Sequence, residues 1–329
     1  MYARNPSPPP DLPDELKYAD NIGDTSYSRQ WLLSLMVKIV DKIKENNKPL
    51  SDDLIEDLDS DFEEQLCLLW DMTVSKDILK CLTDFDLIAV LYGATSCFCH
   101  PRLIEISLGI LANLANEPHA CHKMAEIEDF VPHIFTLFRS HDARILTEAC
   151  RSLLQTVIIS EEYNKPWLDA IRFESDFFEN LMFILRSSTN TGLLMNTIRL
   201  IEAVCRDEDS LAEAWCSPRL ISCILEAQKQ IQWMHGSEVE IIHRLLYIFS
   251  TNQNGVISLV NKSSLVIPML AIYLRKLCED EASCISFGRH HNSLRAIIPV
   301  IDVIVASISP SKALAETSSR MRFTGFSYY

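Results

Sequence analysis

Residues 102–116 read RLIEISLGILANLAN, and their spacing decides the fold. Ile110, Leu111 and Leu114 follow the pattern i, i+1, i+4, which places all three on one face of a helix. The same apolar trio recurs along the chain at successive spacings of 42, 43, 47, 45 and 55 residues. The six trios begin at Leu68, Ile110, Leu153, Leu200, Leu245 and Val300.

A second motif precedes the trios at similar distances. DFVPHIFTLFRS at 129–140 matches DFFENLMFILRS at 176–187, and similar apolar segments occupy 86–96 and 265–275. Each repeat is therefore expected to hold a short helix, an apolar second helix and a long third helix. A period in the forties built from helices is typical of armadillo and HEAT solenoids. We predict an all-α, armadillo/HEAT-like solenoid of about five repeats over 61–309; the alternative is an irregular helical bundle.

The ends of the chain differ from this pattern. Residues 1–27 contain five prolines, at positions 6, 8, 9, 10 and 13, and are predicted to form a disordered tail. Ser7 precedes Pro8 and is a candidate phosphorylation site, although such pairs also occur as unmodified spacers. At the other end, 310–329 is predicted to be a second tail.

An amphipathic helix is predicted over 28–46, with Trp31 on its apolar stripe. The helix either covers the end of the first repeat or binds a partner. An acidic linker, 47–60, follows; the stretch 51–64 carries eight acids and no base. We expect a solvated linker, with docking to a basic partner as the alternative.

Composition excludes several classes of function. The formal net charge of −15 disfavours direct binding of nucleic acid or anionic membranes. The eight glycines are too dispersed for a phosphate-binding loop or a dinucleotide fold, and the G-x-S-x-G and H-E-x-x-H motifs do not occur. We therefore predict no enzymatic activity and no cofactor. The eleven cysteines, together with a start that has no leader pattern, favour a soluble intracellular protein with free thiols.

The remaining cluster with metal-ligand chemistry consists of Cys97, Cys99 and His100, followed by Cys121 and His122. The Cys-x-Cys spacing is tighter than that of a zinc knuckle, and a long helix separates the two groups. We predict no metal, and keep metal binding as the less favoured alternative.

Candidate partner-binding residues lie beside the trios. Asn113 resembles the asparagines by which armadillo domains hold a peptide backbone, but the equivalent positions are Thr156, Ala203 and Ile248. A single amide contributes only about 1 kcal/mol, so a bond at a helix end or between repeats is the favoured interpretation.

Trp31 of the N-terminal helix is a further candidate, and three arginines complete the set. They are Arg151, Arg199 and Arg244, and they would form a basic strip on an acidic protein. Such a strip suits an acidic peptide, whereas solvated arginines are the simpler alternative.

Four stretches resemble one family: RNPSPPP near the start, IGDTSYSRQWL at 22–32, LLWDMTVSKDI, and CHPRLIEISLGILANLA. They are similar to the serum amyloid A-like protein 1 family, also called synoviocyte-proliferation-associated. The likeness is ordered over about the first 160 residues and diffuse afterwards. It implies an armadillo-like intracellular protein, largely nuclear, that promotes cell proliferation, and it supplies no catalytic residues.

The sequence thus predicts a non-enzymatic adaptor that binds another protein through its third helices. The alternative is a regulatory subunit that contacts its partner through the N-terminal helix and the acidic linker. The identity of the partner and the oligomeric state stay open.

Overall fold

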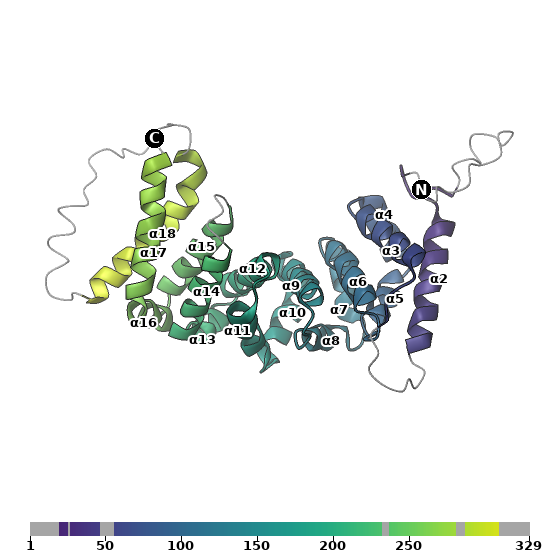
Figure 1. Ribbon diagram of the computed structural model, residues 1–329, viewed down its shortest axis with the longest axis horizontal. Helices are drawn as coiled ribbons and strands as arrows, with labels where there is room; N and C mark the ends of the chain where they lie inside the picture. Colours follow the sequence, from purple (N-terminus) through teal and green to yellow (C-terminus); the bar gives the residue numbers. More distant parts are fainter. Residues whose placement is uncertain (1–19, 26, 47–55, 232–236, 281–286, 309–329) are drawn as a thin grey trace. The chain divides into compact units, whose positions relative to one another are not determined.

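The computed structural model describes residues 20–25, 27–46, 56–231, 237–280 and 287–308 (Figure 1). Within these ranges every regular element is a helix, and one isolated bridge pairs Asn21 with Ser28. The prediction of an all-α solenoid is confirmed. The predicted repeat domain, 61–309, divides into two compact units, one ending at Phe177 and the other beginning at Phe178.

In its described residues, the first unit contains two leading helices, two complete sets of three helices, and the first helix of a third set. They are α2 (Arg29–Asn46), α3 (Ser60–Met72), α4 (Lys76–Asp84), α5 (Leu87–Ala94), α6 (Pro101–Leu114), α7 (Pro118–Glu126), α8 (Phe130–Leu137), α9 (Ala143–Ile158) and α10 (Glu161–Phe173).

The second unit completes the third set and adds two more. Its helices are α11 (Phe177–Ser187), which begins at the boundary, α12 (Thr191–Asp207), α13 (Asp209–Trp215), α14 (Pro218–Gln230), α15 (Ser237–Ser250), α16 (Gln253–Asn261), α17 (Ser263–Asp280) and α18 (Phe287–Ile308).

The apolar trios lie on the long helices and form the core. Leu111 of α6, Leu153 of α9 and Leu245 of α15 are all 0% exposed. We call α3, α6, α9, α12, α15 and α18 the third helices. In unit 1, α6 lies between α3 and α9, and in unit 2, α15 lies between α12 and α18 (Figure 1). Each third helix therefore packs its trio against a neighbouring repeat, as the sequence predicted, and only Leu68 and Ile301, in the first and last trios, are half-buried.

Helix α2 covers the N-terminal end of the repeats in unit 1. Leu32, Leu35 and Ile39 of its apolar stripe are each 0% exposed, and the helix packs against α5 and α3. Trp31 is half-buried, with its ring 6.2 Å from that of Tyr27. The predicted helix 28–46 is thus a cap, because a terminal repeat must cover its apolar end.

The stretch before α2 differs from the prediction of a disordered tail to residue 27. Ile22 is only 2% exposed, and the Arg29 amide donates to the Asp20 carbonyl over 2.9 Å. Gly23 turns the chain with a φ of +54°, and the Asp24 amide donates to Asp77 Oδ2 of α4. A short polar stretch has no apolar periodicity, so the sequence pattern did not reveal this turn. Residues 1–19, including Ser7, lie outside the described residues.

The described end of the acidic linker keeps its acidic side chains exposed, while its backbone and Leu58 contact the protein. The Glu56 amide donates to the Cys99 carbonyl over 2.8 Å, and Leu58 is 8% exposed. Asp59 then caps α3 by accepting hydrogen bonds from the amides of Asp61 and Phe62. One apolar side chain and one cap are enough to hold this segment in place. Residues 47–55, and the predicted tail 310–329, lie outside the described residues.

No single described helix is long and apolar enough to cross a membrane. The bent pair 253–261 and 263–275, with an angle of 84° at its break, passes that test by length and composition only.

Candidate protein-interaction surface

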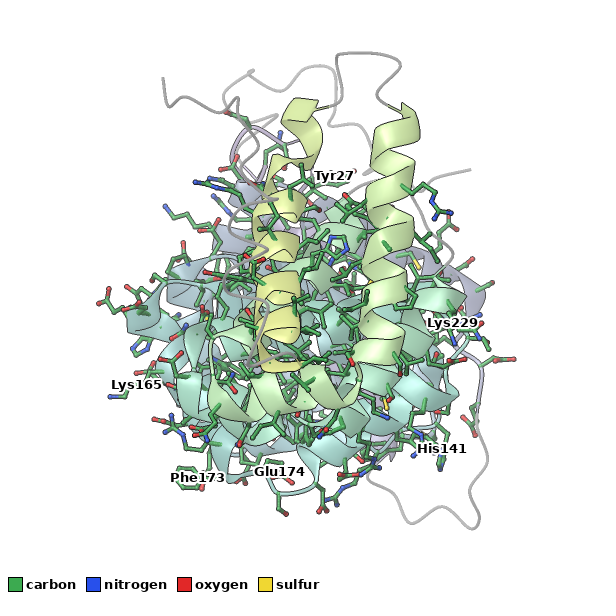
Figure 2. All side chains as sticks on the ribbon, turned by 90° about the vertical axis from the view of Figure 1, so that its left-hand side faces the viewer. Tyr27, His141, Lys165, Phe173, Glu174 and Lys229 are labelled. Carbon is green, nitrogen blue, oxygen red and sulfur yellow. The ribbon has the colours of Figure 1, made fainter. Side chains whose placement is uncertain are left out.

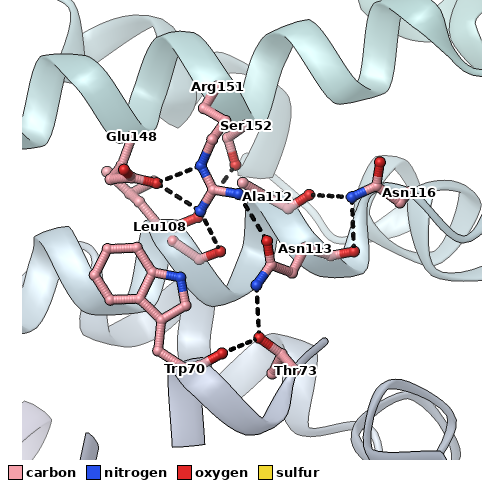
Figure 3. A network of polar contacts seen from close by, with 10 residues as sticks. Trp70, Thr73, Leu108, Ala112, Asn113, Asn116, Glu148, Arg151 and Ser152 are labelled. Atoms are coloured by element: carbon pink, nitrogen blue, oxygen red, sulfur yellow. Dashed lines mark hydrogen bonds and ion pairs between the residues drawn. The ribbon is translucent and has the colours of Figure 1, made fainter. Parts of the chain in front are cut away.

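In unit 1 a polar network joins three third helices, with Arg151 of α9 at its centre (Figure 3). Its guanidinium donates to Asn113 Oδ1 over 2.7 Å, to the Gly109 carbonyl over 2.8 Å and to Glu148 Oε2 over 2.7 Å. Asn113 Nδ2 in turn donates to Thr73 Oγ1, which follows α3, over 2.7 Å. The network connects adjacent repeats through charge-assisted hydrogen bonds.

The indole of Trp70 completes this network. The Arg151 guanidinium carbon lies 5.9 Å from the centre of the Trp70 ring, within range of a cation–π contact. Gly109 makes room for the ring, because a Cβ atom at this position would lie 2.2 Å from Trp70 Cε2. A glycine within a buried helix is thus explained by the close approach of an aromatic ring.

Asn113 occupies the position that the sequence predicted, and it makes the inter-repeat bond that was the favoured interpretation. Both ends of its amide are engaged, one by Thr73 and the other by Arg151. A peptide backbone would have to displace one of these bonds. A direct role for Asn113 in holding a partner stays a prediction.

Replacing Arg151 with alanine is expected to lower the free energy of unfolding by about 2–4 kcal/mol, because Glu148 would lose its ion pair at a largely buried site. Burial already raises the pKa of Glu148, and Arg151 opposes that rise. Urea denaturation followed by circular dichroism measures the loss. Arg144→Ala is the control, since Arg144 is an exposed residue of the same helix. Equal effects of the two substitutions would contradict the role assigned to the network.

In unit 2 the third helices carry a second charged cluster, with Glu202 of α12 at its centre. Its side chain is 5% exposed and lies between Arg244 of α15, at 3.0 Å, and Arg206, at 3.5 Å. Arg244 also pairs with Glu240 at 3.2 Å. Arg244 is therefore neutralised within the unit rather than forming part of a free basic strip.

Arg199 differs from the other candidate arginines. It is half-buried on α12, and its side chain makes no hydrogen bond or ion pair with any described residue. A partly buried charge without a partner is costly unless an external anion approaches it. Of the four candidates beside the trios, Arg199 is thus the one whose charge is available.

The acidic partners in these clusters were missed at the sequence level. Glu148 lies three residues before Arg151, and Glu240 lies four residues before Arg244, which is the spacing of helix ion pairs and could have been found. The contacts of Arg151 with Gly109 and Trp70, and of Arg244 with Glu202, depend on how neighbouring repeats align. The way in which neighbouring repeats pack against each other cannot be read from a single sequence.

The cysteine and histidine groups do not converge. Cys97 and Cys121 are both 0% exposed, and burial raises the pKa of each thiol to about 11. His100 Nδ1 lies 3.1 Å from the Glu56 carbonyl, and His122 lies 3.4 Å from Glu126. Within the described part of the chain, no three His, Cys, Asp or Glu side chains could hold one ion. The geometry gives the metal alternative no support.

The fold defines an armadillo-like helical repeat protein. It is similar to the designed armadillo repeat protein YIII(Dq)4CqI, with a TM-score of 0.53 and 11% identity over 81% of this chain and 99% of that one. A crystal structure of an engineered protein gives a TM-score of 0.53 at 15% identity, covering 81% of this chain and 97% of the other. At such identities the likeness concerns the fold alone.

Sequence relatives identify the family. A family model described as the SAAL1 C-terminal domain matches residues 177–324. Protein saal1 of Danio rerio is 32% identical over 292 residues, 84% of this chain and 62% of that protein. Protein SAAL1 of Homo sapiens is 25% identical over 314 residues, 88% of this chain and 66% of its own length.

The chain belongs to the SAAL1 family, as the resemblance predicted. The likeness extends well past the first 160 residues. The chain spans less than two thirds of the length of these relatives.

Proposed function

We propose that the chain is a non-enzymatic, protein-binding scaffold whose contact surface is formed by the third helices. The observation that carries this proposal is Arg199 on the third-helix face of unit 2, which is half-buried and pairs with none of the described residues. An acidic side chain or a carboxylate of a partner protein would supply the missing charge. The armadillo-like fold supports the proposal, because stacked repeats present long surfaces suited to binding proteins.

A solved structure of similar fold is consistent with this proposal. The structure of the designed armadillo repeat protein YIII(Dq.V1)4CPAF is that of a complex with the peptide (KR)4, and it has a TM-score of 0.52 to this chain at 12% identity. We do not expect a basic peptide on the third helices of unit 1, because the chain's own Arg151 already contacts Asn113 and Trp70 there. We therefore place the partner's anchor at Arg199, and expect an acidic group.

The test is charge reversal at Arg199. Tagged wild-type protein and Arg199→Glu are recovered from cells after crosslinking, and the captured proteins are compared by quantitative mass spectrometry. We expect at least a tenfold loss of the specific partner, because an attraction becomes a repulsion. Arg199 makes no ion pair with a described residue, so the fold is expected to survive the substitution.

Arg186→Glu is the matched control. Arg186 is an exposed arginine of α11 in the same unit, away from the third helices, and its substitution makes the same change in charge. If Arg199→Glu and Arg186→Glu recover the same partners in the same amounts, the third-helix proposal is wrong.

The family resemblance supports two further parts of the proposal: an intracellular, largely nuclear location and a positive effect on cell proliferation. Imaging of the tagged chain and a proliferation assay with Arg199→Glu would test them together. The alternative, contact through the N-terminal helix, is less favoured because the apolar stripe of α2 is buried against α5 and α3.

A further inference from the structure

A pocket of about 380 Å³ lies in unit 1, beside the connection from α3 to α4. It is closed on one side by the turn before α2, which contributes Tyr27. Met72 and Ile78 are apolar lining residues at 5% and 0% exposed, whereas Val74 is 84% exposed. The volume is sufficient for one or two side chains of a ligand.

The wall formed by the turn is held by several hydrogen bonds. Thr25 Oγ1 donates to the Ile22 carbonyl over 2.7 Å, and the Asp24 amide donates to Asp77 Oδ2 over 3.1 Å. Gly23 is required at the bend, because a Cβ atom there would lie 2.2 Å from Asp77 Oδ2. The pocket is therefore built by fixed contacts between the turn and α4.

Two polar side chains that line the pocket have no partner among the described residues, and one of them is acidic. Asp71 and Ser75 line it, and their side chains make no hydrogen bond or ion pair with described residues. Asp24 and Asp71 are both exposed, and Asp77 lies directly behind the turn. Two bases, Lys76 and Arg29, lie close to these acids in the sequence. The charge balance around an apolar pocket thus favours a cationic ligand.

Val74 borders the pocket as an uncovered apolar side chain. Phe173, at the end of α10, is comparably exposed at 82% and extends away from the protein, but it lines no described pocket (Figure 2). Val74, in contrast, stands beside a preformed cavity, so a chain that fills the pocket would also cover this side chain. A peptide gains affinity from both contacts.

We infer that this pocket docks a peptide segment of another protein, with one large apolar side chain in the pocket and lysine or arginine on either side of it. The segment would place its apolar group over Met72 and Ile78, and its cations toward Asp71 and Asp24. This docking site belongs to unit 1 and uses none of the third-helix arginines. It is therefore independent of the proposed contact at Arg199.

The probe is a set of fluorescein-labelled peptides titrated against the full chain by fluorescence polarisation. Each peptide carries Leu, Ile or Phe between pairs of lysines. A second set has alanine as the central residue, and a third has glutamates in place of the lysines. We expect the lysine-flanked apolar peptides to bind at least tenfold more tightly than either other set. The alanine set controls for attraction to an acidic protein as such.

Two exposed positions allow substitution without loss of the fold. Val74→Lys and Asp71→Lys should each weaken binding at least tenfold, by placing a like charge beside the peptide. Phe173→Lys makes the same change at an exposed apolar residue elsewhere in unit 1 and should leave binding unchanged. Arg199→Glu should also leave it unchanged, which separates this site from the proposed function.

The inference is overturned if no peptide of the first set binds the full chain. It is also overturned if binding survives both Val74→Lys and Asp71→Lys, or if the glutamate-flanked peptides bind equally well.

Discussion

Replacing Gly255 with alanine is expected to destabilise unit 2 by about 3 kcal/mol, the upper range for overpacking a well-filled core. Gly255 lies in the first turn of α16, where its amide donates to Asn252 Oδ1 over 2.7 Å. A Cβ atom here would lie 1.9 Å from the Phe249 carbonyl oxygen and 2.6 Å from the carbonyl carbon. These are backbone atoms at the end of α15, so relief requires the two helices to separate.

Gly192→Ala is the control for this effect. Gly192 lies in the first turn of α12, is exposed, and would bring its new Cβ no closer than 3.3 Å to the Asn190 side chain. Because alanine has a higher helix propensity than glycine, we expect a change within about 1 kcal/mol, in the stabilising direction. The test compares the urea denaturation midpoints of Gly255→Ala and Gly192→Ala. Similar midpoints would refute the role of the Gly255 contact.

Lowering the pH below 6.5 is expected to destabilise unit 2 through His243. This side chain of α15 is 0% exposed, neither ring nitrogen has a hydrogen-bond partner among the described residues, and the ring lies 4.4 Å from that of Tyr273. Burial lowers its pKa from 6.5 to about 3. Between these values the unfolded chain takes up the proton and the folded chain does not. Stability is therefore complete above pH 6.5 and falls as the pH falls.

The size of this effect follows from the difference in pKa. Between pH 7 and pH 4.5 the free energy of unfolding should drop by about 2–3 kcal/mol from this residue. His243→Leu removes the group, so its denaturation midpoint should lose that part of the pH dependence and should not be lower than wild type at pH 7. Burial also lowers the pKa of His133 in unit 1, and His133 remains in both proteins. Parallel pH profiles for wild type and His243→Leu would show that His243 does not contribute.

The repeat architecture could be predicted because each trio reports on its own helix. Ile110, Leu111 and Leu114 lie on one buried face of α6, and the trio at Leu200 does the same on α12. The aspartates at the start of the second motif also have a structural role, because they adopt an unusual backbone conformation before the second helix. Asp86 and Asp129 precede α5 and α8 with φ values of 54° and 60°, a conformation that aspartate tolerates better than most residues.

Contacts between repeats could not be predicted in the same way. The approach of Arg151 to Trp70 joins residues 81 positions apart in the numbering, and no periodic pattern fixes the rotation of one helix against the next. The boundary between Phe177 and Phe178 is hidden for a related reason, since the trio spacing continues across it without interruption. The ordered turn at Ile22 was missed because one buried side chain carries no periodicity.

The buried thiols give each unit a chemical reporter of its own opening. Cys97 and Cys121 lie in unit 1, Cys205 and Cys216 lie in unit 2, and burial raises the pKa of all four. An alkylating reagent attacks the thiolate, so labelling at neutral pH has to wait until the surrounding helices part. Peptide mapping of the labelled cysteines would therefore measure the rate of local opening of each unit separately within a single sample.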